Sequence, residues 1–586
     1  MLWKMTDDTV RTSQWVFLWI VSSAGFLSLW LSGRLRAMAN SPILAPLACV
    51  GVAAIVLPAF AFRVPAAAAD SLGILSGLAV AAMSVVLLRE RRNLRASVSI
   101  LTVSALMVAS YAFLQYVGAD VFRWAYSYGG QRPFATLGNP NFLAGHFAVL
   151  LPIAVGMLIL SESAGSGLFW GCVSFAWGMV VVVTQTRSAW LATGVSLGWL
   201  FWWSWRRKPA VIAAARNRLV ALGAVFLAVG FLASLRNPDL LSRFVSLSHP
   251  DLGQFAKRSA SLRAAMFIWR EDPLVGMGPG NFRHGFGKFM GRAMPEGEMA
   301  QFTHTYSEEY VHSDPAQFLC EYGTVGGGLM LWLVVCAAAA LAARAKRGDA
   351  LAACLMASGL AFAVHATFNL PLHIAPTAFI FWAIVGVAGR PFGREGEERG
   401  RGEAGAVPGG RKLLAAAVFL GVGVSGALLF ASSVYSRFGK DYLSVSMWNE
   451  SLDAFGKGMK INWDDRRERF FAASVEFQLG RPEEAVDLFR EEIRRNPYFM
   501  DGFANLGSAL GMMGQIEEAE AMLKRAIGLN PAYAEAWANL GVAMLVAKRH
   551  GEAAGAFRRA LSLEPTLELA QNGLREALAA GGGGGF

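Results

Sequence analysis

Repeated apolar windows, each about 20 residues long, are the feature that most constrains this fold. They are rich in Leu, Ala, Val and Phe, carry almost no charge and end near residue 431 of a 586-residue chain. A helix of this length crosses the hydrocarbon core of a bilayer. We therefore expect twelve membrane spans, at about 15–32, 42–62, 71–88, 97–117, 142–160, 167–185, 188–205, 219–235, 322–343, 350–366, 372–389 and 413–431.

The composition agrees with a membrane protein. Apolar residues make up 54% of the chain and charged residues only 16%, whereas about 25% is usual in soluble domains. The formal net charge of +11 would suit a nucleic-acid partner, but basic residues also collect in the cytoplasmic loops of membrane proteins. We adopt the second explanation and expect no nucleic acid. The five cysteines lie in or beside apolar runs without CxxC spacing, which predicts free thiols.

The distribution of Lys and Arg between the loops predicts the orientation in the membrane. Among the short loops, without the long loop at about 236–321, one alternate set carries twenty of these residues and the other set, with the N-terminal tail, carries six. The basic set is therefore expected in the cytoplasm. This places the loop around Gly138, Arg187, a long loop at about 236–321 and the His365–His373 turn on the outer face. The C-terminal region follows the last span and is expected on the same outer side.

Composition changes divide the chain into regions. Residues 1–431 form the expected membrane domain, which contains a Gly-, Arg- and Glu-rich cytoplasmic linker at 390–412. Residues 432–462 are a connector. Residues 463–578 repeat with a fixed period, and the glycine-rich tail at 579–586 is expected to be disordered.

The repeat has a period of 34 residues. Pro497, Pro531 and Pro565 share this spacing, and Asn-Leu-Gly recurs at 505–507 and 539–541. A 34-residue helix–turn–helix unit with small residues at packing points is the tetratricopeptide pattern. Such repeats stack into a solenoid that binds a protein partner or only supports the assembly. The sequence favours neither role.

Titratable side chains gather just before the ninth apolar window. His312 precedes Ser313 and Asp314, which are suited to cap a helix beginning near Pro315. A histidine at this point is suited to act as a general base for a hydroxyl group. His304, Glu308 and His312 also have the spacing of one helix face, which leaves a metal site as an alternative, although the HExxH form is absent. A structural polar loop is the third interpretation.

Arginines are the candidate anion ligands. Arg187 lies between two closely connected spans, where a charge usually has a partner or a substrate. Arg258 and Arg263 lie on a predicted amphipathic helix before a Gly/Pro turn, and guanidinium groups pair well with phosphate oxygens. Solvated helix faces and an interfacial position of Arg187 are the simpler explanations. His365, in the turn between two spans, is a further candidate for lining the same outer cavity.

Five segments together resemble the superfamily of O-antigen ligases and O-antigen polymerases, which are bacterial membrane glycosyltransferases. The matching segments are TLGNPNFLAGH (136–146), TQTRSAWLA (184–192), RSASLRAAM…DPLVGMGPGNF (258–282), HSDPAQFLCEYGTVGG (312–327) and HATFNLPLHIAP (365–376). Their order and their common placement on the outer face carry the resemblance. The resemblance implies an all-α fold, a polytopic membrane helical bundle followed by an α-solenoid of tetratricopeptide repeats.

The resemblance also implies an activity. Such enzymes move a glycan from undecaprenyl diphosphate to an acceptor hydroxyl on the periplasmic face of the inner membrane, without a nucleotide sugar, cofactor or metal. His312 matches the family's catalytic histidine, and Arg187 and Arg258 match its two substrate-binding arginines. The family has Trp four residues after the second arginine, where this chain has Leu262, so Arg263 is the alternative. Further site neighbours are expected at His304, Glu308, Asn139, Asn141 and His365.

Several functions remain open at this point. The acceptor is a lipid A core in a ligase, a growing glycan in a polymerase, or a protein in an O-oligosaccharyltransferase. A transporter or scaffold with a docking repeat domain is the non-enzymatic alternative. It is disfavoured because the apolar windows hold few acids or bases and show no duplicated halves.

Overall fold

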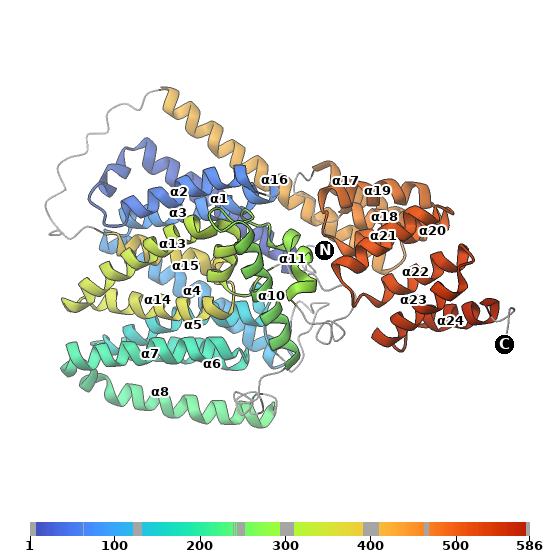
Figure 1. The fold of residues 1–586 in the computed structure, drawn as a ribbon. Helices are drawn as coiled ribbons and strands as arrows, with labels where there is room; N and C mark the ends of the chain where they lie inside the picture. The colour runs from blue at the N-terminus through green and yellow to red at the C-terminus, as the bar shows by residue number, and fades with distance from the viewer. Residues whose placement is uncertain are drawn as a thin grey trace.

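The computed structural model describes residues 7–61, 64–120, 132–237, 240, 242, 252–293, 310–390, 409–461 and 468–581. These parts of the chain contain helices and connecting turns but no β-strand, so the expected all-α fold is confirmed. A bundle of long helices forms one half of the molecule and a stack of short helix pairs forms the other (Figure 1).

The first half of the bundle contains eight α-helices and three short 3-10 helices. They are α1 (Asp7–Leu31), η2 (Arg34–Met38), α2 (Leu44–Val56), η3 (Leu57–Phe60), α3 (Val64–Leu87), α4 (Arg91–Tyr116), η4 (Ala135–Leu137), α5 (Pro140–Ile159), α6 (Ala164–Val183), α7 (Arg187–Arg207) and α8 (Pro209–Arg236).

The second half contains two loop helices, four further α-helices of the bundle and one short 3-10 helix. The loop helices are α10 (Leu252–Glu271) and α11 (Phe282–Ala293), and the others are α13 (Asp314–Lys346), α14 (Ala350–Phe368), η6 (Pro371–His373), α15 (Ala375–Ala388) and α16 (Gly409–Ser444).

Each of the twelve predicted windows coincides with a helix. Nine helices in the described part of the chain are long and apolar enough to cross a membrane. Of the other three, α2 with η3 and α15 are shorter, and α7 carries arginines at both ends. The chain is thus a polytopic membrane protein, and the number of twelve crossings stays a prediction.

Helix α5 occupies the centre of the bundle. Of the residues in its apolar membrane window, 83% are buried inside the protein, whereas the equally apolar α8 has no buried residue in its window. A helix that is apolar all round must be surrounded by protein or by lipid. We therefore place α5 in the core and α8 at the lipid-facing edge, where it forms the outermost helix of the bundle (Figure 1).

The basic loops meet at one end of the bundle. Arg89 donates to the carbonyl oxygen of Ala37 at 2.6 Å, and Arg344 donates to that of Val387 at 2.9 Å. Arg344 also pairs with Asp349, with 2.7 Å between Nη2 and Oδ2. These contacts connect loops whose Lys and Arg content predicts a cytoplasmic position. The candidate site residues lie at the opposite end of the bundle.

Helix α13 begins at Asp314, close to the helix start predicted near Pro315, and it contains the window predicted at 322–343. Two other boundaries differ from the prediction. Helix α16 continues past the predicted end of the last span at 431 into the connector and ends at Ser444. The final helix extends to Gly581, three residues into the tail predicted to be disordered.

The C-terminal part of the chain consists of the predicted repeats. After α17 (Trp448–Ile461) come α18 (Glu468–Gln478), α19 (Pro482–Arg495), α20 (Met500–Met512), α21 (Ile516–Leu529), α22 (Ala534–Val546), α23 (His550–Leu563) and α24 (Glu568–Gly581). Tight packing explains the repeated glycine: a Cβ at Gly507 would lie 2.6 Å from Leu523, and one at Gly541 would lie 2.7 Å from Phe557.

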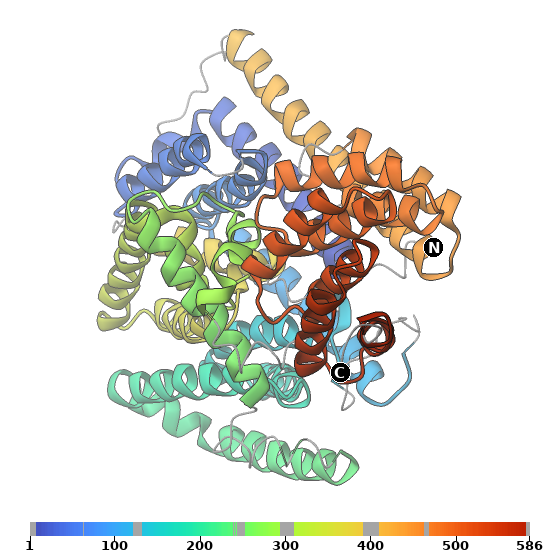
Figure 2. The same ribbon diagram turned by 45° about the vertical axis from the view of Figure 1, so that its right-hand side comes forward.

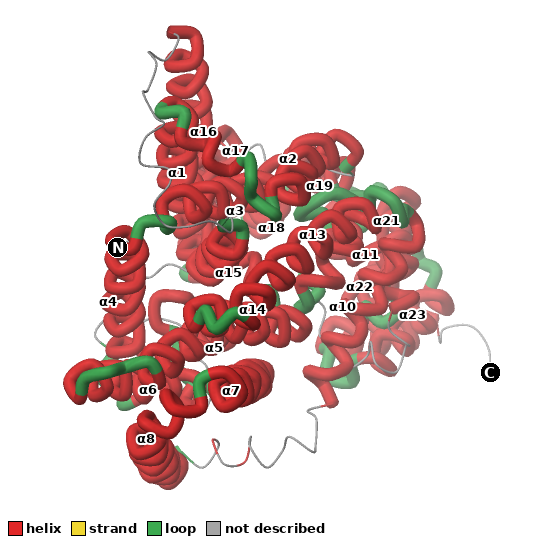
Figure 3. Tube along the Cα trace, turned by 90° about the vertical axis from the view of Figure 1, so that its left-hand side faces the viewer, coloured by secondary structure: helices red, strands yellow, loops and turns green. Residues whose placement is uncertain are grey.

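The repeats pack against the loop helices α10 and α11, a contact we call the repeat–loop interface (Figures 2 and 3). The loop side contributes Ile268, Phe282, Phe286, Phe289 and Met290, and the repeat side contributes Met500, Phe503, Ala504, Leu529 and Tyr533. The backbones approach closely, since a Cβ at Gly287 would lie 2.2 Å from the carbonyl oxygen of Tyr498. The solenoid is therefore joined to the bundle through the long loop that carries Arg258.

Candidate functional site

The N-terminal ends of α5 and α7 are joined by an arginine and two side-chain oxygens. Arg132 donates from Nε to the carbonyl oxygen of Thr184 at 2.8 Å and from Nη2 to Oδ1 of Asn141 at 3.0 Å. Thr186 donates to the same Asn141 oxygen at 3.1 Å. Asn139 caps α5 by accepting from the backbone N–H of Asn141 at 2.9 Å. Two motifs separated by more than forty residues thus form one structure.

A second network joins α7, α14 and α13. Asn369 donates from Nδ2 to Oγ of Ser188 at 2.7 Å, and that hydroxyl lies 3.3 Å from Nδ1 of His365. The carbonyl oxygen of Asn369 accepts from the backbone N–H of Asp314 at 3.2 Å. The C-terminal end of α14 therefore contacts both the residue after Arg187 and the helix that follows His312.

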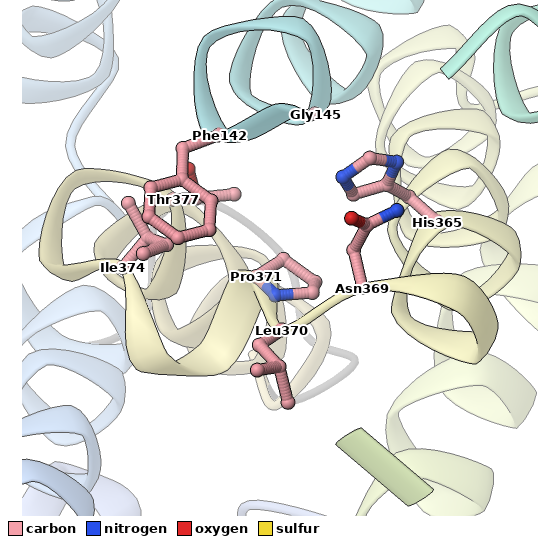
Figure 4. Close-up of a pocket in the computed structure, with 8 residues that line it drawn as sticks. All are labelled: Phe142, Gly145, His365, Asn369, Leu370, Pro371, Ile374 and Thr377. Atoms are coloured by element: carbon pink, nitrogen blue, oxygen red, sulfur yellow. The ribbon is translucent and has the colours of Figure 1, made fainter. Parts of the chain in front are cut away.

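A narrow pocket opens beside this network (Figure 4). Its lining comes from α5, from the end of α14 and from the turn leading into α15. The lining residues are Phe142, Gly145, His365, Asn369, Leu370, Pro371, Ile374 and Thr377. Gly145 faces His365 directly, since a Cβ there would lie 2.3 Å from the imidazole Nε2. The buried His365 is therefore packed tightly against α5.

The three predicted arginines lie in different surroundings. Arg187 is the half-buried first residue of α7, next to Ser188 of the network. Arg258 is exposed on α10, and its Nη1 lies 3.5 Å from the carbonyl oxygen of Phe368 at the end of α14. Arg263 donates from Nε to the carbonyl oxygen of Ala293 at 2.5 Å, at the end of α11. Arg258 is thus better placed than Arg263 for the predicted role.

His312 adopts an unusual backbone conformation. Its φ of 60° lies in the left-handed region, as do those of Gln185 (53°) and Ala135 (46°). Such residues cost on the order of 1–3 kcal/mol each and often lie at functional sites. Gln185 stands two residues before Arg187, and Ala135 precedes the Asn139 cap. The strained backbone of the described bundle therefore occurs in the segments predicted to carry the site.

The Gly/Pro turn between α10 and α11 closes a break in α13. At Gly323 the backbone leaves the helical region, with φ 63° and ψ −171°. The turn fills the gap with four backbone hydrogen bonds: Met277 N–H to Cys320 O at 3.0 Å, Gly278 N–H to Glu321 O at 2.8 Å, Thr324 N–H to Pro273 O at 2.8 Å and Val325 N–H to Leu274 O at 3.1 Å. The rigid turn predicted for GMGPGNF therefore fixes the helix that follows His312.

Asp314 binds the turn between α14 and α15. Its Oδ1 lies 2.9 Å from Nδ1 of His373, and its Oδ2 accepts from the backbone N–H of Leu372 at 2.9 Å. Ser313 occupies the cap position without a side-chain capping bond, so the predicted cap is replaced by this tertiary contact.

Some predicted residues cannot be placed and some site residues were not predicted. His304 and Glu308 lie outside the described residues, so neither their role as neighbours nor the metal alternative built on them is tested. The networks add Arg132, Ser188 and Asn369 to the candidate residues. Ser188 and Asn369 lie within motifs that carried the resemblance, whereas the sequence around Arg132 gave no signal.

Comparisons with known proteins separate two regions of the chain. Residues 170–331 match the model of the O-antigen ligase family, and residues 505–568 match that of the tetratricopeptide repeat. The chain combines an O-antigen ligase region with tetratricopeptide repeats. The ligase region includes Arg187, Arg258, Arg263 and His312. The resemblance inferred from the sequence is thus confirmed over residues 170–331, and the match supports an O-antigen ligase-like membrane function.

Several solved structures, among them tetratricopeptide proteins, are similar to about a quarter of this chain. A MamA crystal structure is 22% identical, covering 26% of this chain and 83% of its own, with a TM-score of 0.24. The tetratricopeptide protein YrrB is 20% identical, covering 28% and 88%, with a TM-score of 0.24. A thermophilic tetratricopeptide protein of Thermus thermophilus is 24% identical, covering 26% and 84%, with a TM-score of 0.24. No curated protein matches the chain.

Proposed function

We propose that this protein transfers a glycan from an undecaprenyl diphosphate carrier to an acceptor hydroxyl at the periplasmic face of the bacterial inner membrane. The observation that carries the proposal is the convergence at the end of α14. Asn369 binds Ser188, which follows Arg187, and its carbonyl accepts from Asp314, which follows His312 by two residues. Arg258 reaches the same helix end at Phe368.

The arginines hold the donor in this mechanism. Arg187 and Arg258 approach the helix end from α7 and α10, so their guanidinium groups bind the diphosphate from two sides. A positive charge placed where negative charge develops on the departing diphosphate lowers the free energy of the transition state by about 3–4 kcal/mol when the site excludes water. The exposed position of Arg258 allows the donor to enter before it is enclosed.

His312 acts on the acceptor. The acceptor oxygen forms a bond to the anomeric carbon while the bond from that carbon to the phosphate oxygen breaks, and the lipid diphosphate leaves with the electron pair. The acceptor proton passes to the His312 imidazole. General-base assistance of this kind contributes about 10²–10⁴-fold. The φ of 60° at His312 supports a role for this residue, because strained backbone of this kind often lies at functional sites.

The repeats support the catalytic loop in this proposal. The repeat–loop interface buries aromatic and aliphatic side chains from both sides, among them Phe286, Phe289 and Phe503. A buried aromatic residue is typical of a stable contact, so the arrangement favours the supporting role of the solenoid over a role confined to recruiting a partner. The repeats hold α10, and with it Arg258, against the bundle.

The test is transfer by purified protein from a lipid-diphosphate glycan to a lipid or peptide acceptor, with release of lipid diphosphate measured in parallel. We expect His312→Ala to lower kcat by about 10²–10⁴-fold and His550→Ala, on the distant α23, to have no effect. Arg187→Ala and Arg258→Ala should weaken donor binding, whereas Arg270→Ala, on the same α10, should not. Normal transfer by His312→Ala would rule out the base assignment.

A further inference from the structure

A second cluster of polar side chains takes no part in the proposed transfer. It is connected through Asp314 to the segment that contains His312. It contains Asp70 of α3, Glu321 of α13 and His373 of η6, which are far apart in the sequence. One carboxylate oxygen of each acid and one ring nitrogen of the histidine all lie within 4.8 Å of one another. Three separate elements therefore direct potential ligand atoms to one point.

Glu321 contributes a buried oxygen without a hydrogen-bond donor. Its Oε1 accepts from the backbone N–H of Phe282 at 3.0 Å and from Nε2 of Gln317 at 2.8 Å. Its Oε2 is fully buried and has no partner among the described residues. Buried carboxylate oxygens are rarely left in this state, because the lost hydration is not replaced. A cation bound at this point would satisfy that oxygen.

The surroundings of His373 are those of a metal ligand. Its Nδ1 is held by Oδ1 of Asp314 at 2.9 Å, which leaves Nε2 as the nitrogen available to the cluster. Histidines that bind metal usually donate their other ring N–H to a carboxylate in this way, and the carboxylate fixes the ring orientation. The backbone carbonyl of His373 also accepts from Nε1 of Trp15 at 2.9 Å, so the turn is held on two sides.

The charge balance points to a cation. Asp70, Asp314 and Glu321 supply three carboxyl groups around one imidazole, and none of the ion pairs described for the chain brings a Lys or Arg to them. Buried carboxylates are stable only when they are paired, protonated or bound to metal.

We propose that Asp70, Glu321 and His373 bind one divalent metal ion. Two carboxylates and one imidazole form a mixed oxygen and nitrogen set, which suits Mn²⁺ or Zn²⁺. The ion ties α3 and the start of α13 to the turn after α14. It lies beside Asp314 and supports the backbone that presents His312, so it has a positioning role and stands independently of the glycan-transfer proposal.

Metal content and binding provide the test. The full-length protein is purified without chelator, its Mn and Zn content is measured by mass spectrometry, and Mn²⁺ binding to metal-free protein is followed by electron paramagnetic resonance. We expect one tightly bound ion per chain, and thermal stabilisation of the wild-type protein by added Mn²⁺. Absence of both effects in the wild type would overturn the proposal and indicate carboxyl groups that share protons.

Variants locate the ion. Glu321→Gln and Asp70→Asn should abolish the tight binding, and Asp314→Asn should weaken it by about 10–100-fold through the histidine. The matched control Glu271→Gln changes an exposed carboxylate on α10 and should bind as the wild type does. Unchanged Mn²⁺ binding in Glu321→Gln and Asp70→Asn would place the ion elsewhere and contradict the assignment. None of these readouts depends on glycan transfer.

Discussion

Gly323→Ala is the substitution whose effect the structure predicts most directly. The residue has φ 63° and ψ −171°, and an added Cβ would lie 2.2 Å from the carbonyl oxygen of Leu274. This region of backbone space is accessible almost only to glycine and costs other residues about 1–3 kcal/mol. The clash would also push away the Gly/Pro turn. Losing two of its four hydrogen bonds adds about 1–3 kcal/mol.

The expected destabilisation is therefore about 2–6 kcal/mol, the sum of the strain and two lost hydrogen bonds. It would be measured as unfolding in mixed detergent micelles, followed by tryptophan fluorescence, with glycan transfer assayed on the same samples. Gly328→Ala is the matched control, because it lies in the same helix with nothing within 4 Å of an added Cβ. That control should be neutral or up to about 1 kcal/mol more stable, since alanine favours helix.

Equal stability and activity of Gly323→Ala and Gly328→Ala would refute this reasoning. It would mean that the break in α13 and its closure by the turn do not hold the segment that carries His312. A Gly323→Ala variant that is less stable but transfers glycan normally would show that the break in α13 is not needed for activity. We predict that this variant loses both stability and glycan transfer.

Three further predictions test other contacts. Phe503→Ala should lower the free energy of unfolding by about 3–5 kcal/mol and raise the KM for the donor. The control Met512→Ala, at an exposed position of the same α20, should change neither quantity. An unchanged KM in Phe503→Ala would count against support of α10 by the repeats. Arg132→Ala should lower transfer and thermal stability, because it leaves Oδ1 of Asn141 with one donor fewer; full activity would show that this link is dispensable. Burial opposes the lowered pKa of Asp349, but hydrogen bonds from Ala352 N–H and Arg344 outweigh it. The stability difference between wild type and Asp349→Asn should therefore persist at neutral pH and disappear as pH falls below 3.8, and a difference independent of pH would contradict this assignment.

The helical elements follow from local sequence. Each of the twelve predicted windows coincides with a helix because the length and apolarity of a window are properties of consecutive residues. The same holds for the repeats, whose 34-residue period fixes both the helix pairs and the small residues between them. The placement of the motif residues at one end of the bundle follows from the alternation of the spans.

Contacts between distant segments could not be predicted in this way. The sequence offered Ser313 and Asp314 as helix caps, but Asp314 instead binds His373, 59 residues later. It offered Arg258 first and Arg263 as the alternative, and the structure adds their different contacts with α14 and α11. The left-handed conformation of His312 is likewise invisible in a sequence without glycine at that position.

By itself, the sequence predicted an all-helical membrane protein with a C-terminal solenoid, and its motifs predicted the similarity to O-antigen ligases. Hydrophobic length and repeat period are sufficient for the helices and the solenoid. Only the tertiary structure decided that the solenoid packs on the loop helices, and that Asp70, Glu321 and His373 meet. The physical reason is that these features depend on side chains from separate helices reaching one place, and such proximity is set by packing.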